Sequence, residues 1–203
     1  MNINLSKGPH IIFFVFFLGF LSIVSSYLLW LLFPDMPFWM ETLSPLASYG
    51  IFFWLFDKYA WKWNVFKLLG VSRFPDLNGR WKGLQKSSYK ENDQNVEVVS
   101  YVEIRQTFSK IYVSSYYEKS QSSSVVASFA DFQDETFLYY TYDNEPNSGR
   151  VGTMQKHRGT VKLRCISNTQ SLSGRYFNDN GNDGEIDLEY IGKELSYKFG
   201  ANS

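Results

Sequence analysis

The chain has 203 residues, its 20 Lys and Arg balance 20 Asp and Glu, and it contains one cysteine and two histidines. A single cysteine excludes an intrachain disulfide, and two histidines leave too few side chains for a typical zinc cluster or a catalytic triad. We therefore expect no metal site, no cofactor and no enzymatic activity.

The first predicted element is an apolar helix over residues 11–33, a run that contains no charged side chain. At roughly 1.5 Å of rise per residue, it is long enough to cross a hydrocarbon core of about 30 Å. A cleaved signal peptide is the alternative, but its apolar region reaches only about 15 residues and ends at a small-residue cleavage site. This run leaves through Pro34 and Asp35 instead, which favours a membrane-spanning helix.

A second apolar segment, over residues 37–56, predicts a second span. Its charge-free part, residues 43–56, is short for a crossing, so a re-entrant or interfacial helix is the alternative. The connection before it carries Asp35 and Glu41 but neither Lys nor Arg. Because Lys and Arg accumulate in the cytoplasmic loops of membrane proteins, this connection is expected outside the cytoplasm.

The basic residues of this half lie only before the first span and after the second: Lys7, Lys58, Lys62, Lys67 and Arg73. We therefore expect residues 1–73 to form a transmembrane helical hairpin with a cytoplasmic juxtamembrane segment and with both chain ends in the cytoplasm. Aromatic side chains cluster beside these cations, as is typical of a membrane–water boundary. They are Trp54, Tyr59, Trp61 and Trp63.

Residues 74–203 form the second predicted domain, with 15 Lys or Arg against 17 Asp or Glu. This balance disfavours DNA and RNA as partners, because their backbones are bound by clustered cations. Alternation of apolar and polar residues predicts strands over residues 79–84, 96–108, 111–118, 122–132, 136–142, 159–167, 172–178 and 185–191, with a ninth suggested at 195–199. Turn formers separate them, for example at 90–93, 144–149 and 178–184.

Short connections between consecutive strands favour an antiparallel meander, and closing the meander removes its exposed edges. We therefore predict a membrane-anchored all-β fold, in which the two helices are followed by a small eight-stranded up-and-down, lipocalin-like antiparallel β-barrel. A two-sheet sandwich has the same strand spacing and stays open as an alternative.

The alternation also assigns an inner face to the barrel. On the last strands this face is mainly apolar: Val161, Leu163, Cys165, Leu172, Gly174, Tyr176, Ile186, Leu188 and Tyr190. On the middle strands it is more polar: Ile104, Gln106, Ser122, Ser124, Val126, Ser128, Leu138, Tyr140 and Tyr142. An apolar floor with a few hydroxyl or amide groups suits a small ligand, although the same hydroxyls also occur as ordinary filler or on solvated faces.

Three smaller features bear on chemistry. Tyr140 and Tyr142 face one side of a strand, where their rings could stack on a base and their hydroxyls could reach a phosphate or sugar. His157 and Arg158 lie in a predicted turn that could bind an anion at the mouth of the barrel, with a solvated turn as the alternative. Cys165 is expected to be a small core residue in a reducing cytoplasm.

The order of these parts is similar to that of a known family. The two apolar helices are followed by FPDLNGRWKG at 74–83, SSS at 122–124, YTYDNEP at 140–146, HRGT at 157–160 and LSGRYF at 172–177. Together they resemble the two-transmembrane, β-strand-rich effectors of bacterial CBASS anti-phage systems, the SMODS-associating, CD-NTase-associated effector family. The resemblance covers nearly the whole chain. The Gly79-Arg80-Trp81 segment also resembles the opening of lipocalin-type barrels, which supports the fold alone.

The resemblance implies a cytosolic barrel that binds a cyclic dinucleotide made by a cognate nucleotidyltransferase, after which the membrane helices oligomerise and disrupt the inner membrane in abortive infection. The matching motif positions, with Gln106 from the polar lining, give the predicted ligand-binding residues: Gln106, Ser122, Ser124, Tyr140, Tyr142, His157, Arg175 and Tyr176. Residues 178–184 lack the basic residue expected after the Tyr-Phe pair. A membrane-tethered lipocalin-like binder of an apolar small molecule and a protein-recruiting membrane scaffold stay open as alternative functions.

Overall fold

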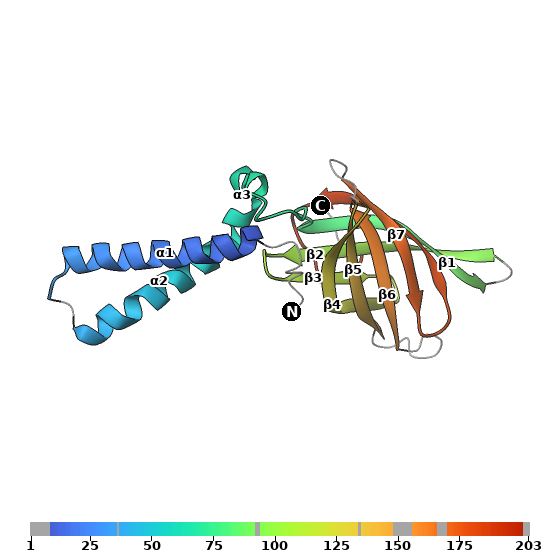
Figure 1. The fold of residues 1–203 in the computed structure, drawn as a ribbon. Helices are drawn as coiled ribbons and strands as arrows, with labels where there is room; N and C mark the ends of the chain where they lie inside the picture. Colours follow the sequence, from blue (N-terminus) through green and yellow to red (C-terminus); the bar gives the residue numbers. More distant parts are fainter. Residues whose placement is uncertain are drawn as a thin grey trace. The chain divides into compact units, whose positions relative to one another are not determined.

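The structure is a computed structural model that describes residues 9–35, 37–91, 94–133, 135–147, 156–165 and 170–200 (Figure 1). It divides into two compact units. One comprises Met1–Arg73 with Thr107–Ser109, and the other comprises Phe74–Gln106 with Lys110–Ser203. Lys7, parts of the predicted turns at 90–93 and 144–149, and the end of the predicted strand at 159–167 lie outside the described residues.

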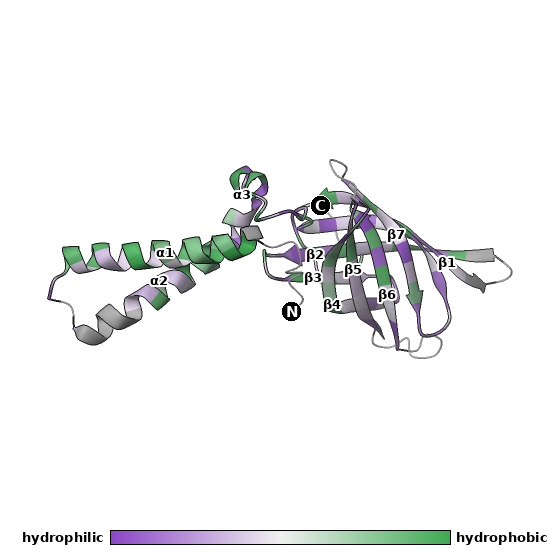
Figure 2. Cartoon of the chain, viewed as in Figure 1, coloured by the Kyte–Doolittle hydropathy of each residue, from purple (hydrophilic) through white to green (hydrophobic). Residues whose placement is uncertain are grey.

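The helical unit contains α1 (Pro9–Leu32), α2 (Phe38–Lys58), the short 3-10 helix η2 (Ala60–Lys62) and α3 (Asn64–Leu68). Within α1, Ile11–Leu32 is the one stretch among the described helices that is long and apolar enough to cross a membrane by length and composition. Figure 2 shows apolar residues along most of its length. The second apolar segment forms α2, which contains Pro45, and its crossing of a membrane stays a prediction.

The first half of α1 packs against the end of α2 and the turns that follow it. The buried side chains of this contact are Phe14, Leu18, Phe56, Trp61 and Val71. The rings of Phe14 and Phe56 lie 4.2 Å apart. The start of α1 and the end of α2 therefore lie at the same end of an antiparallel helix pair (Figure 1).

The second unit is a closed antiparallel barrel in which each strand pairs with its neighbours in sequence and β1 pairs with β8. This confirms the predicted eight-stranded up-and-down barrel and excludes the two-sheet sandwich. The strands are β1 (Gly79–Glu91), β2 (Gln94–Gln106), β3 (Ile111–Tyr116), β4 (Ser120–Phe132), β5 (Glu135–Pro146), β6 (His157–Cys165), β7 (Ser171–Asn178) and β8 (Asp183–Gly192). The suggested ninth strand at 195–199 is wrong, because that segment has no strand structure.

The predicted inner face is confirmed on the last strands, where Val161, Leu163 and Leu172 are buried in the barrel core. On β4 it is wrong beyond Ser124. A bulge there leaves Val125 unpaired between the register pairs Ser124 with Tyr142 and Val126 with Thr141. The extra residue reverses the alternation. Val126 is consequently 59% exposed, whereas Ala127 and Phe129 pack on the core.

The strand β3 is much shorter than its neighbours. It pairs with β2 along its whole length, but its register with β4 covers only Ser114–Tyr116. By contrast, β4 and β5 are paired from Ser120 to Phe132. The wall of the barrel is therefore joined by few backbone hydrogen bonds between β3 and β4.

Residues 193–200, here called the C-terminal strap, cover a buried ion pair on the outer face of β1 and β2. The Ser196 and Tyr197 amides donate to Glu103 Oε1 at 2.7 and 3.0 Å. Arg80 Nη2 donates to the Lys198 carbonyl at 2.9 Å. The strap thus supplies hydrogen-bond partners to both Arg80 and Glu103, whose charged atoms approach each other to 3.7 Å.

Candidate functional site

The interior of the barrel has an apolar half and a half rich in hydroxyl groups. The apolar half is filled by buried side chains, including Val102, Ile104, Val113, Leu138, Leu163, Cys165, Leu172, Ile186 and Leu188. Burial raises the pKa of the Cys165 thiol to about 12, which keeps it protonated and confirms it as a core residue. The inward-facing tyrosines and most of the buried hydroxyls lie in the other half.

Four tyrosines converge in that half, here called the phenol cluster: Tyr117, Tyr140, Tyr142 and Tyr176. The Tyr117 hydroxyl hydrogen-bonds with the hydroxyls of Ser115 and Ser122. The rings of Tyr140 and Tyr142 are tilted against each other with centroids 6.4 Å apart. The predicted pair is thus one part of a larger aromatic group.

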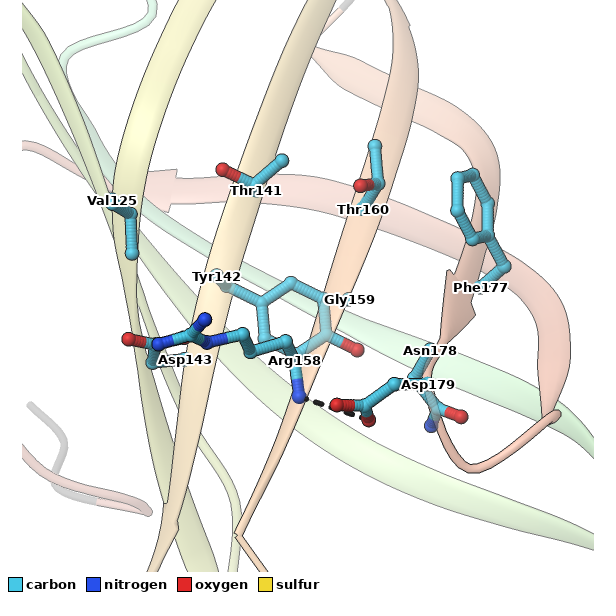
Figure 3. Close-up of a pocket in the computed structure, with 10 residues that line it drawn as sticks. All are labelled: Val125, Thr141, Tyr142, Asp143, Arg158, Gly159, Thr160, Phe177, Asn178 and Asp179. Atoms are coloured by element: carbon cyan, nitrogen blue, oxygen red, sulfur yellow. Dashed lines mark hydrogen bonds and ion pairs between the residues drawn. The ribbon is translucent and has the colours of Figure 1, made fainter.

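Glycines on the neighbouring strands make room for two of these rings. Tyr142 pairs in register with Gly159, and Tyr176 pairs with Gly184. A Cβ at Gly159 would fall on the Tyr142 hydroxyl, and one at Gly184 would lie 2.7 Å from the Tyr176 ring. Figure 3 shows the Tyr142 ring beside Gly159. The glycine of the HRGT motif therefore leaves the space that the Tyr142 ring fills.

Burial keeps three of these phenols neutral, those of Tyr117, Tyr140 and Tyr142. It raises the pKa of Tyr117 to about 12, and it raises the pKa values of Tyr140 and Tyr142 further. Neighbouring phenols add to these shifts, because a second phenolate close by would be repelled. At neutral pH these hydroxyls are therefore available as hydrogen-bond donors and acceptors.

The two predicted serines differ in position. Ser122 is buried and pairs in register with Ser115 and with Asn144. Ser124 Oγ accepts a hydrogen bond from the Val113 amide at 2.9 Å. Ser122 thus belongs to the phenol cluster's surroundings, while Ser124 stabilises the wall next to the bulge.

Gln106 lies at the end of β2 and holds the segment that enters the barrel. Its Oε1 accepts from the Leu77 amide at 2.9 Å, and its Nε2 donates to the Pro75 carbonyl at 3.0 Å. Its backbone exchanges two hydrogen bonds with the Asn78 side chain. The structure therefore gives Gln106 a structural role away from the tyrosines.

The two predicted basic residues also separate. The predicted turn at His157 and Arg158 is wrong, because both residues begin β6 and pair with β5. The His157 ring lies edge-on to Tyr142, with centroids 6.2 Å apart, at the margin of the hydroxyl-rich half. Arg175 is exposed on the outer wall and forms an ion pair with Asp183 at 3.3 Å. The structure thus brings together Ser122, Tyr140, Tyr142 and Tyr176, places His157 at their edge, and leaves Arg175 outside.

A groove of about 530 Å³ lies over β4 to β7, with Tyr142 among its lining residues (Figure 3). Its outer-facing side chains include Thr141, Thr160 and the exposed ring of Phe177. Arg158 Nε donates to Asp143 Oδ1 at 2.8 Å, and the Arg158 amide donates to Asp179 Oδ1 at 3.0 Å. The Arg158 guanidinium is therefore already paired with the Asp143 carboxylate, whereas Asp179 is held by the backbone amide.

Sequence reasoning missed two members of the hydroxyl-rich half, Ser115 and Tyr117. Both follow Val113 at intervals of two in the predicted strand 111–118, so the alternation already placed them on the inner face. No group of three or more His, Cys, Asp or Glu able to hold a metal occurs among the described residues.

Two comparisons relate this chain to known proteins. A family model described as Cap15, cyclic dinucleotide receptor domain, matches residues 72–190, which include nearly all of the barrel. A curated relative, CD-NTase-associated protein 15 from Staphylococcus schleiferi, is 26% identical over 154 residues, covering 75% of this chain and 81% of the relative.

Proposed function

Since the chain belongs to the family of the Cap15 cyclic dinucleotide receptor domain, we propose that its barrel receives a cyclic dinucleotide signal in a CBASS effector. The match over residues 72–190 carries this proposal, because it covers the folded unit that holds the phenol cluster. The curated relative supports the same role through its name, which associates it with a CD-NTase.

The hydroxyl-rich half suits such a ligand. Aromatic rings stack on bases irrespective of sequence, and hydroxyl groups hydrogen-bond to phosphate and sugar oxygens. The phenol cluster supplies both, and Ser115 and Ser122 add hydroxyls beside it. The groove of about 530 Å³ that Tyr142 also lines lies on the outer wall, so this volume describes the outer surface and not the interior at the phenol cluster. We therefore place the ligand at the phenol cluster, with the groove at Tyr142 as its nearest open surface.

The named groups around the phenol cluster carry no formal charge. Ser115, Ser122 and Asn144 are uncharged, burial keeps Tyr117, Tyr140 and Tyr142 protonated, and the Arg158 guanidinium at the groove is paired with Asp143. The two ligand phosphates are thus expected to be held by hydroxyls and backbone amides, without a dedicated cation. Binding of this kind weakens less with added salt than binding through surface lysines does.

The response is proposed to take place at the membrane. Ligand binding would favour an assembled state of the barrels, α1 and α2 would cluster in the inner membrane, and the bilayer would be disrupted. A ligand drives such a change only by binding the assembled state more tightly. Restriction to a membrane raises the local concentration, so a modest preference is sufficient. We propose no catalytic step.

Calorimetric titration of the full-length protein in detergent with a panel of cyclic dinucleotides tests the proposal. One member should give saturable binding and larger assemblies in size-exclusion chromatography, while the linear dinucleotide of the same bases should give neither. Absence of both heat and thermal stabilisation with every member would refute the receptor role. Binding without a change in assembly size would refute only the proposed response.

A further inference from the structure

The segment that follows α2 is strongly basic. Between residues 57 and 73 there are four cations, Lys58, Lys62, Lys67 and Arg73, against the single acid Asp57. The Asp57 carboxylate accepts a hydrogen bond from the Ser109 amide at 2.7 Å. The net charge of this stretch is therefore positive even though the whole chain is neutral.

The segment has a fixed conformation. The ring of Phe66 packs against Phe14 and Phe56, with centroids 5.6 and 5.0 Å away. Gly70 adopts a left-handed conformation with φ of 68°, and the Val71 amide donates back to the Phe66 carbonyl at 3.0 Å. This turn ends α3 and buries Val71 in the helical unit's core.

The same turn leaves large apolar side chains in the open. Leu68 is 89% exposed and Trp63 is 61% exposed, and Val65 and Leu69 are also exposed. Because Phe66 and Val71 hold the segment in place, these side chains cannot turn inward without unpacking it. A contiguous group of exposed apolar side chains on a fixed scaffold marks a surface that meets another apolar phase.

Cations and exposed apolar side chains thus alternate over residues 58–69, here called the juxtamembrane surface. We propose that this surface binds anionic phospholipids, with Lys58, Lys62 and Lys67 at the headgroup phosphates and Leu68 and Trp63 among the upper acyl chains. This combination is that of interfacial segments that prefer anionic membranes. The position of the surface, at the start of α1 and the end of α2, favours lipid over a soluble partner because α1 is apolar along its length. The proposal rests on the proposed insertion of α1 in the membrane.

The expected size of the effect follows from the charges. Each lysine near an anionic membrane surface strengthens binding on the order of fivefold. Replacing all three lysines with glutamine should therefore weaken the preference for anionic over zwitterionic lipid on the order of a hundredfold.

The test uses the full-length protein in mixed micelles with equal amounts of phosphatidylglycerol and phosphatidylcholine, and native mass spectrometry counts the lipids that it retains. The wild type should retain phosphatidylglycerol preferentially. The variant K58Q/K62Q/K67Q should lose this preference, while K86Q/K119Q/K193Q, with the same charge change on the barrel, should keep it. Equal retention of both lipids by the wild type, or an unchanged preference in K58Q/K62Q/K67Q, would overturn the proposal.

Two further measurements separate the possible failures. Reconstitution in phosphatidylcholine nanodiscs reports insertion alone, so a protein that does not enter them contradicts the proposed membrane anchor and with it this surface. Calorimetry with the cyclic dinucleotide reports the barrel alone, and K58Q/K62Q/K67Q should bind it as the wild type does. Loss of that binding together with loss of helical and strand signal in circular dichroism would assign the lipid defect to unfolding and overturn the assignment of the lysines.

Discussion

Replacing Glu103 with alanine should destabilise the barrel far more than replacing an exposed glutamate does. The side chains of Arg80 and Glu103 are 3% and 2% exposed, and their charged atoms approach to 3.7 Å. The carboxylate also accepts the amides of Ser196 and Tyr197 in the C-terminal strap. The substitution would leave a buried guanidinium without a counter-charge and two strap amides without an acceptor.

Removing one partner of a buried ion pair costs about 3–5 kcal/mol, because the remaining charge stays out of water. For a domain of this size, such a loss corresponds to a fall in Tm of roughly 10 °C or more. Glu135→Ala is the matched control. Glu135 pairs with Arg164 on the outer surface, where an ion pair contributes about 1 kcal/mol or less.

The assay is thermal unfolding of the full-length protein in detergent, followed by circular dichroism at the strand signal. The double variant Arg80→Met/Glu103→Leu completes the cycle. It should lose less stability than Glu103→Ala, because it leaves no buried charge. If Glu103→Ala lowers Tm no more than Glu135→Ala, the strap is not held by the buried pair and the reasoning is wrong.

Three other results are expected. Gly159→Val should lower the free energy of unfolding by about 1–3 kcal/mol, because the new side chain would collide with the Tyr142 hydroxyl. Gly192→Ala is the control and should leave Tm unchanged, because a Cβ there meets no atom within 4 Å. Burial raises the pKa of Tyr117 from 10.0 to about 12, so the contribution of its protonated phenol to the free energy of unfolding is complete below pH 10. This contribution is lost between pH 10 and 12, where the unfolded chain alone gives up the proton. Tyr117→Phe should therefore make the free energy of unfolding, measured in urea, fall less steeply with pH over that range, and an unchanged pH dependence would place the phenol in water. In calorimetric titration, Tyr140→Phe should lower the affinity for the cyclic dinucleotide about fivefold or more, and Arg175→Ala should lower it less than twofold. The reverse order would place the ligand on the outer wall.

The barrel was predictable from the sequence because period-two alternation and short turns act locally. The same alternation placed Tyr140, Tyr142 and Tyr176 on the inner face, where the structure has them. The alternation failed at Val126, because a bulge of one residue moves every later side chain of β4 to the opposite face. No glycine or proline marks this bulge in the sequence.

The predicted site residues show where motif and alternation disagree. Arg175 entered the prediction through its motif, yet its position between Gly174 and Tyr176 already assigned it to the outer face, and the structure agrees with the alternation. Gln106 has the expected inward position, but its side-chain amide is already hydrogen-bonded to the backbone of Pro75 and Leu77. Contacts with a segment some thirty residues earlier in the chain are beyond the reach of local patterns.

Because β3 is short, the barrel should open most easily between β3 and β4. Opening the β3–β4 seam ruptures the short ladder of Gln121–Ser123 and the hydrogen bonds of the Tyr117 and Val113 amides to Ser120 and Ser124. Separating β4 from β5 would break a ladder that runs from Ser120 to Phe132. Amide exchange should accordingly be fastest along this seam. Ser115 and Ser122 stand on its two sides and are linked through the Tyr117 hydroxyl. A guest that enters laterally would meet the phenols first, without passing either rim of the cylinder.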